Sequence, residues 1–435
     1  MIRLRDRCRQ RIRYKTFVMP DSVLIHLQPV LGMAVIIAIA WALSEDRRAF
    51  RFRLVASALA LQAAIAILLL KVPIARQALL GLNAVVTALA KATGAGTSFV
   101  FGYMGGGPPP FAVTNPAGLT NFAFGVLPLV IVISALSALL WYWRVLPLIV
   151  GGLAYVLRKT LALGGATALG CGTTVFLGMI EAPLLIRPCL PRMTRTELFI
   201  LFTVGLASVA GTMFVLYATV LANVIPGALG HVLVASMMAL PGAVLIARLM
   251  VPGDSVTEHI PADLGFRSSM DAVARGTEDG LKIFLQIMAL LIVMLALVSL
   301  ADQILSVLPH PGGAAITLER VLGWLFSPLV WLYGVPWSQA PVAGALMGTK
   351  AVLNELVAYL DFAALPKGAL DERSGLIMVY ALCGFANLGS VGILIAGMST
   401  LMPERRAEIV PLCFKALISG TLASGLSACM IGLLT

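Results

Sequence analysis

The sequence predicts an all-α protein that crosses a membrane many times. Hydrophobic residues make up 60% of its 435 residues and charged residues only 12%, with a mean hydropathy of +0.97. Soluble domains carry roughly 25% charged residues, so lipid is the expected solvent of this chain. The apolar residues form long continuous runs instead of alternating with polar ones, which argues against a transmembrane β-barrel. The predicted fold class is therefore a polytopic α-helical membrane protein.

Eight apolar segments are long enough to span a bilayer, because a spanning helix needs roughly twenty residues. The predicted spans are 27–43, 53–71, 124–143, 197–221, 229–250, 281–301, 374–399 and 409–434. Segments 73–92 and 145–160 are moderately amphipathic and are expected to lie on the membrane surface.

Two further apolar segments, 165–190 and 336–362, do not fit simple spans. Each is interrupted by Gly or Pro and carries an acid in its middle, Glu181 in the first and Glu355 in the second. Irregular backbone is tolerated at membrane depth only where protein or water surrounds it. An ionised Glu at the bilayer centre costs about 3 kcal/mol, so such acids are usually retained for function. We therefore expect two re-entrant helical hairpins that carry functional acids.

A small or polar cluster follows each acid in a later apolar segment. Residues 207–211 form this cluster after the first hairpin, and residues 384–390 form it after the second. Interrupted hydrophobic units at matching places in two halves are typical of secondary transporters, which bind their substrate near the bilayer midplane. The eight spans and two hairpins are thus predicted to form two inverted repeats around one site.

The predicted elements divide the chain into five regions. Residues 1–26 form a basic tail, which is either disordered or the product of an over-long start. Residues 27–123 hold the first two spans, a surface helix and a Gly/Pro loop, and serve as a scaffold. Residues 124–250 hold the third span, the first hairpin and two spans, and residues 251–280 form a cytoplasmic linker. Residues 281–435 hold a span, the second hairpin and the last two spans. Basic linkers between spans set the orientation.

Charge and cysteine spacing argue against other classes of protein. The net charge of +11 reflects Arg and Lys in short linkers, which is an orientation signal of membrane proteins and gives no reason to expect nucleic-acid binding. The six cysteines lack the spacing of metal ligands. A membrane-embedded enzyme would need a nucleophile with a base, or metal ligands, in its spans, and we find neither. Acids in two hairpins favour an occluded site over the open pore of a channel. We therefore expect no enzymatic activity and no cofactor.

Five blocks of sequence closely resemble the concentrative nucleoside transporter family, over roughly residues 30–435. The blocks are residues 122–136, 178–188, 193–199, 348–360 and 380–390. The resemblance implies eight spans, two re-entrant hairpins of opposite orientation and a homotrimer in the bacterial inner membrane. It also implies import of nucleosides coupled to a cation gradient. Transport of another small polar solute is the alternative.

The first hairpin differs from the family at its tip. The family reads Gly-Gln-Thr-Glu there and contacts the nucleobase, whereas this chain reads Gly178, Met179, Ile180 and Glu181. The chain therefore resembles a divergent bacterial member. Nucleobase edges are patterns of donors and acceptors, so the loss of two polar side chains should weaken or change discrimination between bases.

The family's ribose contacts are all present in the second half. They fall on Glu355, Asn387 and Ser390, with the aromatic ring of Phe385 beside the sugar. A carboxylate and an amide suit vicinal hydroxyls, because each can take part in two hydrogen bonds. The competing interpretation is a structural ion pair between Glu355 and Lys350.

The family's sodium site maps onto the first hairpin and the span that follows. The side chains of Thr174 and Ser208, with backbone groups of Leu177 and Val209, take these positions. Thr174 replaces the family's Asn, and its hydroxyl is a weaker ligand for a hard cation than a carboxamide. We slightly favour sodium as the coupling ion. Proton coupling through one of the two buried acids is the alternative, because burial favours the protonated form of a carboxyl group.

Overall fold

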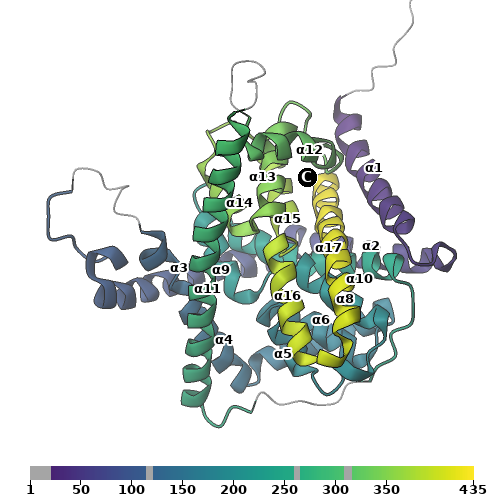
Figure 1. Cartoon of the computed structure of the whole chain (residues 1–435), viewed down its shortest axis with the longest axis horizontal. Helices are drawn as coiled ribbons and strands as arrows, with labels where there is room; N and C mark the ends of the chain where they lie inside the picture. The colour runs from purple at the N-terminus through teal and green to yellow at the C-terminus, as the bar shows by residue number, and fades with distance from the viewer. Residues whose placement is uncertain (1–20, 114–120, 259–264, 308–315) are drawn as a thin grey trace, which may run out of the picture.

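The computed structural model describes residues 21–113, 121–258, 265–307 and 316–435 (Figure 1), so most of the predicted tail 1–26 lies outside the described residues. The described residues form helices and turns without a strand, as the predicted all-α class requires. Six of their helical segments are long and apolar enough to cross a membrane. These are Phe52–Lys71, Phe122–Tyr142, Arg195–Leu221, Ala228–Met250, Ser269–Leu305 and Pro403–Leu434.

The α-helices fall into three groups along the chain. The first group is α1 (Asp21–Ala42), α2 (Phe52–Lys71) and α3 (Pro73–Phe101). The second is α4 (Leu129–Tyr142), α5 (Val145–Leu161), α6 (Gly165–Leu177), α7 (Glu181–Leu185), α8 (Arg195–Ala207), α9 (Gly211–Leu221) and α10 (Ala228–Met250). The third is α11 (Ser269–Leu305), α12 (Leu318–Leu332), α13 (Ala340–Val352), α14 (Glu355–Ala364), α15 (Glu372–Leu382), α16 (Leu388–Leu401) and α17 (Arg406–Leu434).

The helix order of the second group is repeated in the third. Each begins with an apolar helix, α4 or α11, and these two helices pack against each other. An amphipathic helix follows, α5 or α12, and packs against the first limb of a helix pair, α6 or α13. We call the pair α6 and α7 hairpin 1, and the pair α13 and α14 hairpin 2. A broken helix and then a long helix complete each half, and the long helices α10 and α17 pack together. Re-entry of the hairpins into the membrane stays a prediction.

Two predicted spans are broken in the middle. Segment 374–399 is divided into α15 and α16, and segment 197–221 into α8 and α9, so neither is the continuous helix that we predicted. The break between α15 and α16 contains Gly384 at φ +154°. Asn387 then caps α16 by accepting a hydrogen bond from the Ser390 N–H at 2.8 Å. Both breaks fall on the small or polar clusters noted in the sequence.

Other elements also differ from the prediction. Helix α3 runs on to Phe101 instead of ending at residue 92, and it extends to one side of the bundle, away from α1 (Figure 1). Helix α12 was not predicted, because its 15 residues are too short for a span and include Pro328. The predicted span 27–43 corresponds to α1, whose apolar stretch His26–Ala42 is shorter than the six spans above.

The broken helix of the first half lies at the centre of the bundle. In their most apolar stretches, 94% of the residues of α8 and α9 and 83% of those of α10 are buried, against 6% in α11. Helix α11 instead presents large apolar side chains outward, such as Ile292 at 71% and Ile304 at 65% exposure. The break between α8 and α9 is therefore surrounded by protein. Irregular backbone is tolerated at membrane depth in such surroundings.

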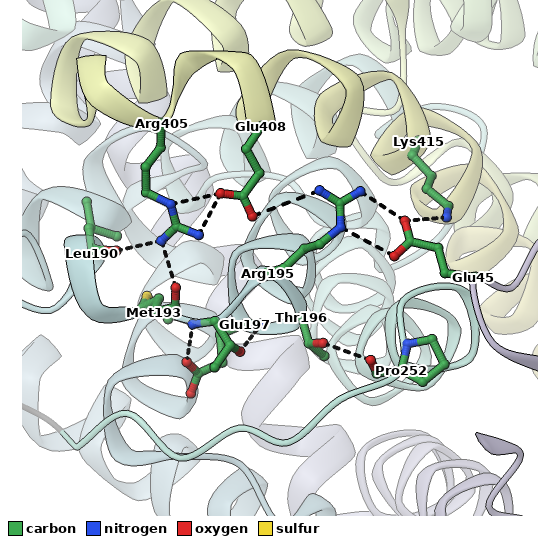
Figure 2. Close-up of polar contacts among 11 residues, drawn as sticks. Glu45, Leu190, Met193, Arg195, Thr196, Glu197, Pro252, Arg405, Glu408 and Lys415 are labelled. Atoms are coloured by element: carbon green, nitrogen blue, oxygen red, sulfur yellow. Dashed lines mark hydrogen bonds and ion pairs between the residues drawn. The ribbon is translucent and has the colours of Figure 1, made fainter.

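A charged cluster joins the linkers at one end of the bundle (Figure 2). Arg195 at the start of α8 lies 2.9 Å from Glu45, and Lys415 of α17 lies 3.0 Å from the same carboxylate. Arg405 pairs with Glu408 at 2.7 Å, and Glu408 also faces Arg195 at 3.9 Å. The hydrogen bond from Arg195 lowers the pKa of Glu45, so this carboxylate stays ionised at pH values below its ordinary titration range. The segments that join α1 to α2, α7 to α8 and α16 to α17 are thus in contact at this end of the bundle.

The same cluster also contacts the segment between hairpin 1 and α8. Arg405 donates a hydrogen bond to the Met193 carbonyl at 2.7 Å (Figure 2). Thr194 caps α8 together with Glu197, which accepts hydrogen bonds from the Thr194 N–H at 2.8 Å and from the Thr257 N–H at 2.9 Å. The polar linker after α10 is therefore attached to the start of α8. Thr167 near the start of α6 donates to the same Glu197 carboxylate at 3.2 Å, which joins hairpin 1 to this linker.

Candidate functional site

Both hairpin tips and both helix breaks line one cavity. All eight predicted substrate contacts line it, namely Gly178, Met179, Ile180, Glu181, Glu355, Phe385, Asn387 and Ser390, together with Leu177 of the predicted cation site. Residues that the sequence analysis did not select complete the lining, among them Thr212 of α9 and Gln286 of α11. Residues from five separate parts of the chain thus meet in one place: the tips of both hairpins, both helix breaks and α11.

Hairpin 1 turns at a glycine that its geometry requires. Gly178 ends α6 with φ +101° and ψ 177°, a conformation that is essentially restricted to glycine. A Cβ atom at Gly178 would lie 2.8 Å from Glu181 Oε2 and 3.2 Å from Ala210 Cβ. The absence of a side chain therefore lets the tip rest on the break between α8 and α9, with the Glu181 carboxylate folded back over it.

The two apolar residues of this tip each pack against a glycine. Met179 is 9% exposed, and a Cβ atom on Gly205 of α8 would lie 2.8 Å from Met179 Cβ. A Cβ atom on Gly397 of α16 would lie 2.5 Å from Ile180 Cδ1. The tip of hairpin 1 thus contacts the broken helices of both halves, while both residues also line the cavity.

Two hydrogen bonds hold the carboxylate of Glu355. It is the first residue of α14 and is 4% exposed. Tyr217 Oη donates to Oε1 at 2.6 Å, and Asn387 Nδ2 donates to Oε2 at 3.1 Å. The Oδ1 of Asn387 is engaged in capping α16, so its amide cannot turn over without losing that cap. Each oxygen of Glu355 keeps further acceptor capacity for a ligand in the cavity.

The competing interpretation of Glu355 as the ion-pair partner of Lys350 is not supported. Lys350 Nζ donates instead to the Ala381 carbonyl at 2.8 Å and to Ser424 Oγ at 3.2 Å. The ion pairs formed between described residues do not include one between Lys350 and Glu355.

The predicted cation ligands lie where hairpin 1 meets the first break. Thr174 is 3% exposed and Ser208 1% exposed. Each hydroxyl donates to the carbonyl four residues earlier at 2.8 Å, which leaves its oxygen lone pairs free to accept. The Val209 N–H donates to Ser236 Oγ at 3.3 Å, and a Cβ atom on Gly211 would lie 2.9 Å from the carbonyl of Phe176. The end of α6 and this break are therefore neighbours.

Any cation held here would depend on neutral oxygen ligands. Among the described residues, no group of three or more His, Cys, Asp and Glu side chains could hold a metal ion. Hydroxyl and carbonyl oxygens are suitable ligands for hard cations. The donor set of Thr174, Leu177, Ser208 and Val209 fits a hard monovalent cation better than a transition metal.

The two breaks are in direct contact with each other. The Phe385 N–H donates to the Ser208 carbonyl at 3.2 Å. Ser236 of α10 contacts both breaks, because its Oγ accepts from Val209 and lies 3.7 Å from Cys383 Sγ. The predicted cation site and the residues beside Glu355 are therefore joined by a single backbone hydrogen bond.

Comparison with known proteins shows the family of the chain. Residues 31–104 match the family model described as the N-terminus of Na+ dependent nucleoside transporters, and residues 231–432 match the model of the C-terminus. The chain is 35% identical over 413 residues to the nucleoside permease NupC of Helicobacter pylori, which covers 93% of this chain and 96% of that protein. The chain belongs to the concentrative nucleoside transporter family.

Further concentrative nucleoside transporters are similar over nearly the whole chain. The putative nucleoside permease NupX of Escherichia coli is 34% identical over 421 residues, which cover 93% of this chain and 98% of that protein. The structure of CNTnw in an inward-facing substrate-bound state is 38% identical, with a TM-score of 0.85 and coverage of 94% of this chain and 99% of that one. A CNTnw variant in an outward-facing state is 37% identical, with a TM-score of 0.86 and coverage of 94% and 98%.

In this concentrative nucleoside transporter, sequence reasoning missed two polar residues near the cavity. Tyr217 of α9 is fully buried and holds Glu355, and its ring lies 5.0 Å from that of Tyr359. Gln286 of α11 lines the cavity from a largely apolar helix. A buried tyrosine hydroxyl usually finds a hydrogen-bond partner, and a polar side chain inside a span often marks a function. The sequence shows both polar side chains in apolar segments, but it does not show which residues they contact.

Proposed function

We propose that this protein is a secondary active transporter that imports nucleosides, with sodium as the favoured coupling ion. Its membership of the family makes it a cation-coupled nucleoside transporter, since its relatives are named as permeases and transporters and not as enzymes. The observation that carries the proposal is Glu355, fixed by Tyr217 and Asn387 at the meeting point of both hairpins and both breaks. A site between two repeats suits alternating access.

The ribose would bind in the second half of the site. Glu355 is a fixed acceptor for the sugar hydroxyls, and charge-assisted hydrogen bonds are stronger than neutral ones. Asn387 and Ser390 are 1% and 7% exposed and lie at the start of α16 beside it. Phe385 lines the same cavity and offers an apolar surface to the sugar.

The nucleobase would bind at the tip of hairpin 1. Glu181 is the polar side chain of that tip, since Met179 and Ile180 are apolar. A carboxylate accepts from amino and ring N–H groups but offers no donor to a carbonyl oxygen. We therefore propose either broad tolerance of bases or a preference for purines over uracil.

Replacing Met179 by Gln together with Ile180 by Thr should change this preference. The double variant supplies donors that the tip lacks, and one hydrogen bond can change relative affinity by roughly tenfold. We expect the ratio of adenosine to uridine uptake to fall by about that factor. Competition uptake with both nucleosides measures the ratio. If it stays unchanged, the side chains at these positions do not face the base.

Tyr217→Phe should weaken nucleoside binding by about tenfold, because it removes one hydrogen bond to a charged group. The ring and its contact with Tyr359 at 5.0 Å are kept, so packing changes little. Isothermal titration with uridine and adenosine measures the effect. The matched control is Tyr155→Phe on α5, where the side chain is 60% exposed and hydrogen-bonded to Lys159. Equal affinities in the two variants would contradict the role of Tyr217.

The coupling ion is proposed from the donor set of hairpin 1. Thr174, Leu177, Ser208 and Val209 together offer hydroxyl and carbonyl oxygens, which suit sodium. Proton coupling through Glu181 or Glu355 is the alternative, because burial favours the protonated form of a carboxyl group.

Proteoliposomes test the function and the ion together. We expect uridine or adenosine to accumulate against its gradient when a sodium gradient is imposed, and not when only a pH gradient is imposed. Accumulation that follows pH and ignores sodium would remove the proposed role of Thr174. The absence of nucleoside accumulation under either gradient would overturn the proposed function.

The protein is further proposed to act as a homotrimer in the bacterial inner membrane. The resemblance to the family implies the trimer, and the outward-facing apolar side chains of α11 leave a large surface for lipid and neighbouring subunits. Native mass spectrometry from lipid nanodiscs gives the number of subunits directly.

A further inference from the structure

Hairpin 2 contains a buried ammonium group that the proposed substrate contacts do not use. Lys350 lies in the last turn of α13 and is 1% exposed. Its two hydrogen-bond acceptors, the Ala381 carbonyl and Ser424 Oγ, are both neutral. Burying a charge is strongly unfavourable unless it is well compensated. Charged groups in such positions usually mark a functional requirement.

Both limbs of hairpin 2 are attached to the last turn of α15. Lys350 from α13 donates to the Ala381 carbonyl at 2.8 Å, and Tyr359 from α14 donates to the Val379 carbonyl at 2.8 Å. Carbonyl groups in the last turn of a helix carry partial negative charge, which favours a cationic donor such as Lys350. The Val379 carbonyl also accepts the Cys383 N–H at 3.2 Å. Glu355 lies between the two attached residues in the chain, so these contacts fix the tip that presents it to the cavity.

The two halves differ at the position of Lys350. Counted from the helix end, Thr174 of α6 corresponds to Thr349 of α13. The carbonyl of each accepts the N–H of the residue that follows its helix, at 3.0 Å and 2.8 Å. On this count Lys350 corresponds to Val175, which is apolar and buried. The second half thus carries a positive charge where the first half carries none.

We propose that Lys350 is a positioning residue that acts as a tethered cation. Its ammonium holds hairpin 2 to the end of α15, as the coupling cation holds hairpin 1 to the end of α8 at Thr174 and Ser208. The inference rests on the proposed cation-coupled transport of nucleosides. One half of the site then needs a cation from solution, whereas the other half has its own. Lys350 therefore sets nucleoside affinity through Glu355 and leaves the affinity of the first half for its cation unchanged.

Lys350→Met tests this, because methionine fills the space of the lysine stem without its charge. We expect the nucleoside Kd of the purified full-length protein, measured by titration with uridine and adenosine at saturating sodium, to rise at least tenfold. The sodium affinity is measured without nucleoside, from the sodium-dependent rise of the melting temperature. It should stay within twofold of the unsubstituted protein. Lys415→Met in the charged cluster is the matched control, and it should change neither constant.

Three outcomes would overturn the inference. One is an unchanged nucleoside Kd in Lys350→Met, and another is an equal loss of nucleoside and sodium affinity, which indicates general damage to the fold. If Lys350→Met does not fold, Ser424→Ala replaces it, and the nucleoside Kd and the sodium affinity are compared in the same way. Ser424→Ala removes only one acceptor of Lys350, so it should raise the nucleoside Kd two- to fivefold. The third outcome against the inference is an unchanged nucleoside Kd in Ser424→Ala. Failure of the unsubstituted protein to bind any nucleoside would instead overturn the proposed function.

Discussion

Glu355→Gln is expected to lower nucleoside uptake by roughly a hundredfold or more, since it removes the charged acceptor of about two ligand hydrogen bonds. Glutamine has a single acceptor oxygen, whereas Tyr217 and Asn387 donate to both oxygens of the carboxylate. Asn387 cannot turn its amide without losing the cap of α16. The new amide nitrogen must therefore face Tyr217, and little acceptor capacity remains for the sugar.

Uptake into proteoliposomes and the nucleoside Kd of the detergent-solubilised protein measure this loss. The fold should be retained, because the substitution preserves shape, and size-exclusion chromatography with a melting curve checks it. Glu258→Gln in the linker after α10 is the matched control, since this side chain is exposed and its ion pair with Arg158 is long, at 3.9 Å. Ordinary uptake by Glu355→Gln would place Glu355 among the structural residues and remove the ribose assignment.

Gly178→Ala is expected to reduce uptake by at least tenfold and also to lower stability. The backbone at Gly178 has φ +101° and ψ 177°, where a residue with a side chain is strained by about 1–3 kcal/mol. The added Cβ would also lie 2.8 Å from Glu181 Oε2 and 3.2 Å from Ala210 Cβ. Because the backbone of the break cannot give way easily, the Glu181 carboxylate must move out of its place at the tip.

The control for this variant is Gly151→Ala in α5. A Cβ atom there meets no atom within 4 Å, and alanine favours the helix. Its melting temperature should equal or exceed that of the unsubstituted protein, while Gly178→Ala should melt several degrees lower. If Gly178→Ala retains full uptake and full stability, the tip of hairpin 1 does not have the conformation described here.

Particular residues show how far the sequence could predict the site. Glu181 and Glu355 could be selected from the sequence, because placing an acid inside an apolar membrane segment costs free energy and such a position is evident from the neighbouring residues alone. Tyr217 did not stand out, since a tyrosine in an apolar span can hydrogen-bond to many partners. Its acceptor, Glu355, is 138 residues away in the chain. Helix α12 was missed because a short amphipathic segment has neither the length of a span nor a clear boundary signal.

Hydropathy also could not predict that two of the expected spans are broken helices. Segments 197–221 and 374–399 each have enough apolar residues for a span, and hydropathy cannot register a change of backbone direction inside an apolar run. The breaks form where the tip of hairpin 1 and the opposite break supply packing and hydrogen bonds, such as that from the Phe385 N–H to the Ser208 carbonyl. Those partners belong to other parts of the chain.

The sequence by itself determined the membrane class, the places of the two hairpins and the acids within them. These features depend on local composition, because each charged side chain or unpaired backbone group placed in lipid costs free energy, whatever the rest of the fold. Only the tertiary structure decided that both tips and both breaks enclose one cavity, that Tyr217 and Asn387 hold Glu355, and that Lys350 is attached to α15 instead of to Glu355. Such contacts join residues far apart in the chain, and their partners are set by how whole helices pack.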